Sequence, residues 1–144
     1  MENKTTSSTS LVEEIVGAPI SDHSSVINAV RTGLPFHAIT TLEEALRVSR
    51  REISLALHIR LATMSRRKSS GKLRADESDR VVRLANIFDQ ATTLMGGNGD
   101  EAARWMTTPR AILDDETPLM RSTTKIGAKD VEDLMYRIRY GNFS

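Results

Sequence analysis

The residues best suited to chemistry in this 144-residue chain are the arginines and lysines between Arg50 and Arg74. This segment holds eight basic residues and one acidic residue, Glu52, and so carries a net charge of +7. Since the whole chain carries +1, the remainder carries −6. Arginine binds phosphates and guanine edges through paired hydrogen bonds, and lysine binds phosphates as a point charge. The segment is therefore typical of nucleic-acid binding, although a solvated helix face has the same composition, and the acidic remainder indicates a second partner.

The elements that must position these side chains begin at two capping boxes. Residues 41–44 and 49–52 each have Thr or Ser at the first position and Glu at the fourth. In this pattern the hydroxyl and the carboxylate each accept a backbone N–H at the start of a helix. Two helix starts eight residues apart predict short helices over about 41–48 and 49–57, joined by tight turns, which is the spacing of a helix-turn-helix.

A third short helix, predicted over about 61–69, is the one expected to enter the DNA major groove. Ile53, Leu57 and Met64 are spaced to pack the two helices of the motif together. His58 occupies the turn position that usually holds Gly, and His tolerates the left-handed backbone conformation better than most residues. The side chains predicted to contact DNA are Arg60, Thr63, Arg66, Arg67, Lys68 and Lys72.

The whole pattern predicts an all-α chain with three regions. Residues 1–23 begin with a run rich in Ser and Thr and are expected to be a flexible segment. Residues 24–95 are expected to form the helix-turn-helix and dimerisation region, and residues 96–144 a small helical domain. The glycines of residues 96–99 mark the boundary, although the long helix before them is expected to contribute to both halves. Besides the helix-turn-helix, helical pieces are predicted over about 11–16, 24–32, 76–95, 98–107 and 128–140.

The C-terminal region contains two candidate sets of binding residues. One is an apolar set on short segments framed by proline, which forms either an interface or the domain's own core. Its members are Trp105, Met106, Ile112, Leu113, Leu119 and Met120. The other set lies at the end of the last helix, which buries Val131, Leu134, Met135 and Ile138 in this prediction. Its members, Arg137, Arg139, Tyr140, Asn142 and Phe143, either bind a partner or form a plain helix end with a frayed terminus.

The sequence gives no indication of catalysis, a metal centre or a cofactor. The chain has no Cys, and His23, His37 and His58 are isolated in sequence, so no nucleophile or acid–base pair is indicated. The acidic run at residues 114–116 has no distant partner to complete a metal site, and the glycines at 96–99 lack the strand and the Lys-Ser/Thr of a phosphate-binding loop. No apolar run reaches the ~18 residues of a membrane span, and the expectation is a non-enzymatic cytoplasmic protein.

Three stretches after the basic segment resemble antitoxins of the Xre/MbcA/ParS family. Residues 71–85, GKLRADESDRVVRLA, are similar to the family's G-x-L-x-x-x-E-S-D-R-x-x-R-L-A. Residues 105–119, WMTTPRAILDDETPL, are similar to its W-[LM]-x-x-P … L-x-x-x-T-P-L. Residues 127–141 are similar to its closing G-x-x-x-V-x-x-L-x-x-R-I-x-x-G, matched here by Gly127, Val131, Leu134, Arg137, Ile138 and Gly141. The resemblance extends over about residues 34–143.

The resemblance implies the antitoxin of a type II toxin–antitoxin module. It implies an N-terminal Xre/Cro-like helix-turn-helix domain that binds operator DNA and represses the shared operon, and a small helical toxin-binding domain after it. The usual partner is a RES-domain toxin, which resembles an ADP-ribosyltransferase and destroys NAD, and whose NAD pocket the antitoxin obstructs. The residues at the end of the last helix are then expected to bind the toxin. The helix-turn-helix itself predicts a homodimer, because such proteins read two half-sites through two-fold symmetry.

Two departures from the family pattern and one alternative function remain. Many relatives have a Gly-containing turn where this chain has Asp and Glu at residues 114–116, and the turn Gly of the helix-turn-helix is His58. The alternative is a helix-turn-helix transcription regulator whose C-terminal domain serves dimerisation or senses a small ligand.

Overall fold

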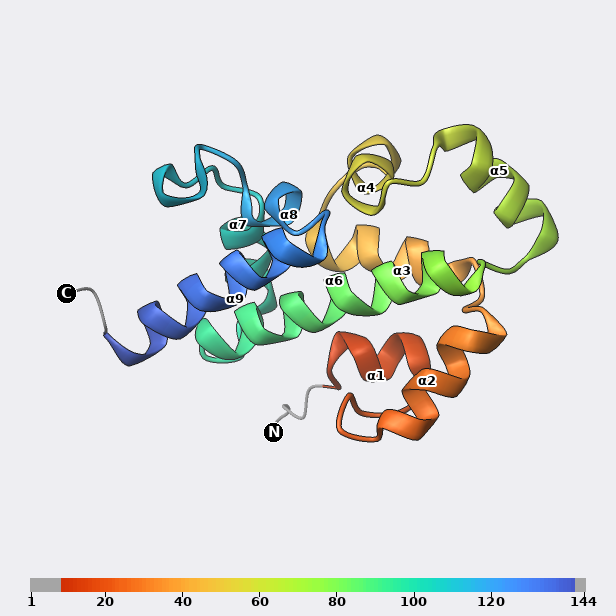
Figure 1. Cartoon of the computed structure of the whole chain (residues 1–144), viewed down its shortest axis with the longest axis horizontal. Helices are drawn as coiled ribbons and strands as arrows, with labels where there is room; N and C mark the ends of the chain where they lie inside the picture. The colour runs from red at the N-terminus through yellow and green to blue at the C-terminus, as the bar shows by residue number, and fades with distance from the viewer. Residues whose placement is uncertain (1–8, 142–144) are drawn as a thin grey trace.

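Helices account for nearly all regular structure in residues 9–141, the part of the chain that the computed structural model describes (Figure 1). In chain order they are α1 (Leu11–Val16), α2 (His23–Thr32), α3 (His37–Leu46), α4 (Arg50–Leu57), α5 (Leu61–Ser70), α6 (Ala75–Leu94), α7 (Gly99–Met106), the short 3-10 helix η2 (Ala111–Leu113), α8 (Pro118–Arg121) and α9 (Lys125–Tyr140). These described residues contain one isolated antiparallel bridge, between Pro35 and Lys72, and no strand. The predicted all-α fold is confirmed.

The longest helix, α6, is at the centre of the fold. Figure 1 shows α1 and α2 on one side of it and α4, α7 and α8 on the other, and α9 runs beside its C-terminal half. The start of α6 is capped by Glu77, whose carboxylate accepts the N–H of Arg74 at 2.9 Å. Val81, Leu84 and Ala85 are buried at helical spacing along it. Because helices from both ends of the chain pack on α6, it sets their positions relative to one another.

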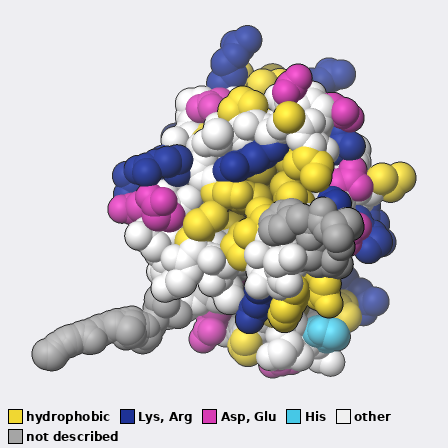
Figure 2. All heavy atoms as spheres, turned by 90° about the vertical axis from the view of Figure 1, so that its left-hand side faces the viewer, with side chains coloured by type: hydrophobic (Ala, Val, Ile, Leu, Met, Phe, Trp, Pro, Cys, Tyr) yellow, Lys and Arg dark blue, Asp and Glu magenta, His cyan; other side chains and the backbone are white. Residues whose placement is uncertain are grey.

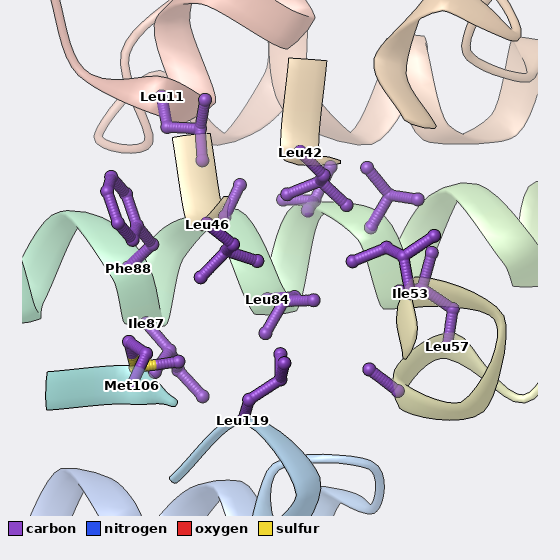
Figure 3. Packing of buried hydrophobic residues seen from close by; sticks show 14 of the residues in the cluster. Leu11, Leu42, Leu46, Ile53, Leu57, Leu84, Ile87, Phe88, Met106 and Leu119 are labelled. Carbon is purple, nitrogen blue, oxygen red and sulfur yellow. The ribbon is translucent and has the colours of Figure 1, made fainter. Parts of the chain in front are cut away.

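One hydrophobic core extends through the described chain and crosses the expected boundary at residues 96–99. Figure 3 shows Leu84 and Ile87 of α6 pointing toward Leu119 of α8 and Met106 of α7. On the other side of the same helix, Phe88 lies near Leu11 of α1. The N-terminal and C-terminal helices therefore share a core rather than having one each.

The predicted pair of helices around His58 is present as α4 and α5. As predicted, α4 begins at a capping box: the Ser49 hydroxyl accepts the N–H of Glu52 at 3.1 Å, and the Glu52 carboxylate accepts the N–H of Ser49 at 2.9 Å. His58 ends α4 in the left-handed conformation with φ of 54°, which confirms the expectation for this turn position. The turn is closed by the Ser54 hydroxyl, which donates to the Ile59 carbonyl at 2.5 Å.

The helix start predicted at Thr41 is wrong. Helix α3 begins at His37, and the Thr41 hydroxyl, inside the helix, donates to the His37 carbonyl at 3.1 Å. It therefore satisfies a carbonyl of the preceding turn instead of an N–H at a helix start. The earlier start follows Pro35, whose carbonyl accepts the N–H of Ala38 at 3.0 Å and whose ring holds φ near the helical value.

The segment expected to be flexible, residues 1–23, contains α1. Leu11 and Val12 are buried in the core, and their N–H groups donate to the Asp89 carboxylate on α6 at 2.7 and 3.0 Å. The helix predicted over about 11–16 is thus present, and it is docked rather than flexible because two apolar side chains and an acceptor on a distant helix hold it. Residues 1–8 lie outside the described part of the chain.

Helix α9 approaches the end of α8 closely because Gly127 has no side chain. A Cβ at this position would lie 1.8 Å from the Arg121 carbonyl oxygen. The helix begins three residues earlier than predicted, where the Thr124 hydroxyl accepts the N–H of Gly127 at 3.0 Å. Its buried residues include Val131, Leu134 and Met135, as predicted. Ile138, expected in the same stripe, is 37% exposed, so the buried stripe ends a turn early.

Candidate functional site

Helix α5 presents a basic face to solvent. Arg66 is exposed on the side opposite the buried Met64 and donates to the Thr63 hydroxyl at 3.1 Å. The other exposed basic residues, before, on and after the helix, are Arg60, Lys68 and Lys72. Five of the six residues predicted to contact DNA are therefore gathered around one solvent-facing helix.

The sixth predicted residue, Arg67, is held within the protein. Its guanidinium donates to both oxygens of the Glu77 carboxylate on α6, at 2.8 and 3.1 Å, and the two side chains are only 17% and 7% exposed. The hydrogen bond to Glu77 raises the pKa of Arg67. Burial by itself would raise the pKa of Glu77, but the hydrogen bonds from Arg67 and from the N–H of Arg74 outweigh it and hold that pKa below its ordinary value. Both groups are therefore charged at neutral pH, and the pair joins α5 to the start of α6.

A second arginine joins α6 to the turn before α5. Arg80 Nη1 donates to the carbonyls of Leu57 at 2.6 Å and His58 at 3.0 Å, and Arg80 Nη2 donates to the Asp76 carboxylate at 3.2 Å. These carbonyls lie at the C-terminal end of α4, where no helical N–H remains to bind them. A cation is also favourable at that end of a helix. Arg80 therefore stabilises the turn between the two helices of the motif.

The segment after α5 is held by backbone pairing and by Ser78. Leu73 donates its N–H to the Leu34 carbonyl at 2.8 Å, and the N–H of Leu34 donates to the buried Ser78 hydroxyl at 2.9 Å. The Glu, Ser and Arg of residues 77–80 thus each hold a part of the helix-turn-helix. In the sequence, this stretch served only as part of the family resemblance. The available signal for its structural role was a polar group in the first turns of a long helix that directly follows the basic helix.

The apolar set of the C-terminal region divides into core and surface. Buried members are Trp105, Met106, Leu113 and Leu119, whereas Met120 is half-buried and Ile112 is 57% exposed. The Arg110 guanidinium lies over the Trp105 ring, 5.0 Å from its centroid, and burial lowers the pKa of Arg110. Trp105 is therefore a core residue covered by an arginine, and Ile112 is the member most available to a partner.

The acidic run at residues 114–116 forms a tight loop around Arg121. Asp114 and Asp115 adopt the left-handed conformation, with φ of 57° and 66°, which Asp tolerates better than most residues. Arg121 binds Glu116 at 3.0 Å and Asp130 at 2.8 Å, and these hydrogen bonds raise the pKa of Arg121. The loop, which has no Gly, is therefore held by the left-handed Asp residues and by Arg121. Across residues 9–141, no three or more His, Cys, Asp or Glu side chains are grouped to hold a metal ion, and none of the helices is long and apolar enough to span a bilayer.

The end of α9 carries the second set of predicted binding residues. Tyr140 is 60% exposed, and its ring centroid lies 4.6 Å from that of Tyr136, which is 61% exposed. The Arg139 guanidinium lies 5.7 Å from the Tyr140 centroid, whereas Arg137 is half-buried. The other two predicted residues, Asn142 and Phe143, lie outside the described part of the chain.

A groove of ≈ 380 Å³ lies between this end of α9 and the C-terminal half of α6. Leu94, Met135 and Tyr136 line it, and Gln90 and Glu132 join its two sides through a hydrogen bond of 2.8 Å. Figure 2 faces the end of the molecule where α6 and α9 finish and shows apolar side chains gathered there among charged ones. Sequence reasoning missed Tyr136; the available signal was a second aromatic four residues before Tyr140, on the same helix face.

Comparison with known proteins assigns both regions. Residues 25–86 match the antitoxin Xre-like helix-turn-helix domain, and residues 90–141 match the antitoxin Xre/MbcA/ParS C-terminal toxin-binding domain. The chain is similar to an antitoxin Xre of Yersinia enterocolitica, with 30% identity over 130 residues that cover 90% of this chain and 88% of that protein. It is similar to antitoxin Xre of Photorhabdus laumondii, with 34% identity over 127 residues (88% and 86% covered), and of Pseudomonas putida, with 35% over 77 residues (54% and 48% covered).

The two matches coincide with the two surfaces. Helices α4 and α5 with their basic face lie in the first matched range, and α9 with its groove lies in the second. This chain belongs to the Xre/MbcA/ParS family of antitoxins of type II toxin–antitoxin systems, and it combines a DNA-binding helix-turn-helix domain with a toxin-binding domain.

Proposed function

We propose that this antitoxin neutralises a RES-domain toxin, an enzyme that degrades NAD, by covering the toxin's active site with the end of α9 and the residues after it. The observation that carries the proposal is the exposed group of Tyr136, Arg139 and Tyr140 within the toxin-binding domain. Tyr and Arg are enriched at interface hot spots. An NAD pocket accepts planar rings and binds phosphates, and this group presents two rings and a guanidinium. The choice of a RES-domain toxin rests on the resemblance of the sequence to antitoxins with that partner.

The surface proposed for the toxin consists of Arg137, Arg139, Tyr140, Asn142 and Phe143, with Tyr136 added. The test combines Arg139→Ala and Tyr140→Ala with removal of residues 141–144, which leaves the buried residues through Met135 in place. The matched control is Ile126→Ala, an 81% exposed residue at the other end of α9.

Each variant is coexpressed with the protein encoded by the adjacent gene, which the proposal expects to be a RES-domain toxin, and cellular NAD is measured. The combined variant should let NAD fall, and Ile126→Ala should preserve it. A combined variant that folds, binds the toxin and fully preserves NAD would exclude the end of α9 and the residues after it as the inhibitory element. The search would then move to the exposed Ile112 on η2.

For the other half of the molecule, the proposal is that α5 enters the major groove and that the antitoxin represses its own operon. The same proposal has the protein act by binding alone, in the cytoplasm. The contacts proposed are Arg60, Thr63, Arg66, Lys68 and Lys72, which surround the solvent-facing side of α5. Each lost phosphate contact flattens the salt dependence of binding by about one unit of slope.

The measurement compares Arg66→Ala with Lys129→Ala, which removes the same charge from an exposed position on α9. A labelled duplex of the DNA directly upstream of the antitoxin gene is titrated over a salt series. Arg66→Ala should bind more weakly and with a flatter slope, and Lys129→Ala should bind like the parent. Parent-like binding by Arg66→Ala would remove this residue from the interface. Toxin neutralisation should survive both changes.

The DNA-binding form is proposed to be a homodimer, because a helix-turn-helix reads two half-sites about 34 Å apart through two-fold symmetry. The N-terminal helices and α6 are the expected dimer surface, and Ile27 on α2 is 46% exposed there. Light scattering should give twice the 16.0 kDa of one chain. Ile27→Glu should lower that mass without loss of helical content. A mass of 16.0 kDa for the parent alone, together with one chain per duplex in the DNA complex, would exclude the dimer.

A further inference from the structure

We propose that Arg67 and Glu77 form a positioning pair, which fixes the orientation of α5 on the protein, and that Arg67 does not itself contact DNA. This inference rests on the proposed binding of DNA through α5. It gives a different role to a residue whose type and place in the sequence predict a DNA contact.

The Arg67 guanidinium is held by Glu77 through two hydrogen bonds, from Nε and from Nη2. It binds both oxygens of Glu77, and the same carboxylate accepts the N–H of Arg74 at 2.9 Å, which prevents the carboxylate from turning away. Bidentate arginine–carboxylate pairs are among the strongest polar contacts in proteins. A phosphate that drew the guanidinium away from Glu77 would leave that side chain, which is 7% exposed, as a buried charge without its partner. When the pair stays intact, this penalty for an unpaired buried charge does not arise.

Apolar packing alone holds α5 weakly. Of its ten residues, Met64 is the one that is buried. The remaining attachments of the helix are polar: Arg80 holds the turn before it, residues 71–73 pair with the segment before α3, and Arg67 holds its centre. Loss of the Arg67–Glu77 contact would therefore leave α5 attached by Met64 alone and by the segments at its two ends.

Orientation matters because the side chains of a recognition helix must meet base edges in a groove about 12 Å wide. A tilt of α5 about Met64 would displace Arg66, on the opposite face, while the charge of Arg66 stayed near the DNA. Loss of positioning should therefore weaken binding to a specific site more than binding to DNA in general.

Glu77→Gln separates the two roles because they predict effects of opposite sign. If Arg67 touches a phosphate, this change frees the arginine, removes a nearby negative charge and makes binding equal or tighter with a steeper salt slope. If the pair positions α5, binding to the upstream duplex weakens roughly tenfold with the slope unchanged. The matched control is Asp79→Asn, the same chemical change on an exposed residue of α6 that pairs with Arg83 instead of α5. It should bind like the parent.

A second variant, Arg67→Gln, completes the comparison. Positioning predicts a similar loss of affinity with the parent's slope, and a Glu77→Gln, Arg67→Gln double variant no weaker than either single one. A slope flatter by about one unit would show that Arg67 contacts phosphate and would overturn the proposal. If Glu77→Gln fails to fold by circular dichroism, Arg67→Lys is measured instead, because it keeps the charge and loses the paired hydrogen bonds. A roughly tenfold loss then supports positioning, and parent-like affinity overturns it.

Failure of the DNA-binding proposal would be seen separately, in the parent protein. A parent that binds the upstream duplex no better than an unrelated duplex does not repress through that DNA. The variants are then compared on the unrelated duplex at low salt, where phosphate contacts dominate. There, tighter binding by Glu77→Gln would overturn the positioning pair, and parent-like or weaker binding with an unchanged slope would support it.

Discussion

The Asp89 carboxylate accepts the backbone N–H of Leu11 at 2.7 Å, a contact between residues 78 positions apart. It also accepts the N–H of Val12 at 3.0 Å, while the Ser10 hydroxyl accepts the N–H of Glu13 at 3.0 Å. The first N–H groups of α1 are thus satisfied partly by its own cap and partly by a side chain of α6. Burial raises the pKa of Asp89, and the hydrogen bonds from Val12 and Leu11 act against that shift.

Asp89→Ala should release α1 from α6. Two buried N–H groups would lose their acceptor, so the free energy of unfolding should fall by about 1–3 kcal/mol. Hydrogen exchange should accelerate at the amides of Leu11 and Val12. Asp79→Ala, an exposed residue of the same helix, should leave both quantities unchanged. Parent-like exchange in Asp89→Ala would show that apolar packing alone docks α1.

Protonation of Glu77 should lower the free energy of unfolding in acid. Its folded-state pKa lies below the ordinary value of 4.5, so its contribution is present above pH 4.5 and is lost as the pH falls through the folded value. Glu77→Gln should therefore reduce the fall in unfolding free energy between pH 7 and about pH 3, measured by urea titration. Asp89→Asn should instead enlarge the fall. Burial raises the pKa of Asp89 in the folded protein, so protonation of Asp89 stabilises the folded state as the pH falls, and the variant lacks this gain. Equal pH dependence in the parent and Glu77→Gln would contradict the role of this carboxylate.

Gly127→Ala should be strongly destabilising. Its Cβ would meet the Arg121 carbonyl oxygen at 1.8 Å, so the backbone between α8 and α9 has to move, at a cost of about 1–3 kcal/mol or more. Gly99→Ala, where a Cβ meets nothing within 4 Å, should be neutral or stabilising by less than about 1 kcal/mol. Chemical denaturation of the two variants measures the difference. Equal midpoints would show that the contact relaxes without cost.

Leu119→Ala should destabilise the helix-turn-helix as well as the C-terminal helices. Leu119 is 2% exposed and points toward Leu84 of α6, so the cavity should lower the free energy of unfolding by about 2–5 kcal/mol. Because the core is shared, hydrogen exchange should accelerate in α4 as well as in α9. Ile112→Ala, on an exposed side chain in the same region, should change stability by less than about 0.5 kcal/mol. Separate unfolding transitions for the two halves would argue against a shared core.

Features that depend on neighbouring residues could be predicted from the sequence. The Ser49 capping box forms with a residue three positions away, and the left-handed turn at His58 is a property of the local backbone. Thr41 shows the limit of such patterns, because its hydroxyl, predicted to accept an N–H, could instead donate to the nearby His37 carbonyl. A capping pattern indicates which bonds are available, and the path of the chain decides which one forms.

The roles that sequence reasoning missed depend on contacts between helices. Arg67 has the residue type and position of a DNA contact, and its engagement depends on a carboxylate ten residues later on another helix. The docking of α1 depends on Asp89, in the distant half of the sequence. Tyr136 lies outside the stripe that helical periodicity assigns to the core, so its place beside the groove follows only from the packing of α9 on α6.

The sharing of α6 restricts how new partner combinations can arise by recombination. Its first turns hold the basic helix through Glu77 and Arg80, and its last turns line the groove through Gln90 and Leu94. A crossover at the glycines of residues 96–99 would join a foreign α7 and α8 to an α6 surface shaped for other side chains. A lineage that exchanges its toxin specificity with a relative must therefore exchange α6 as well. The residues that hold α5, Glu77 and Arg80, would then be exchanged with it, so the basic helix and the toxin-binding domain would be inherited together.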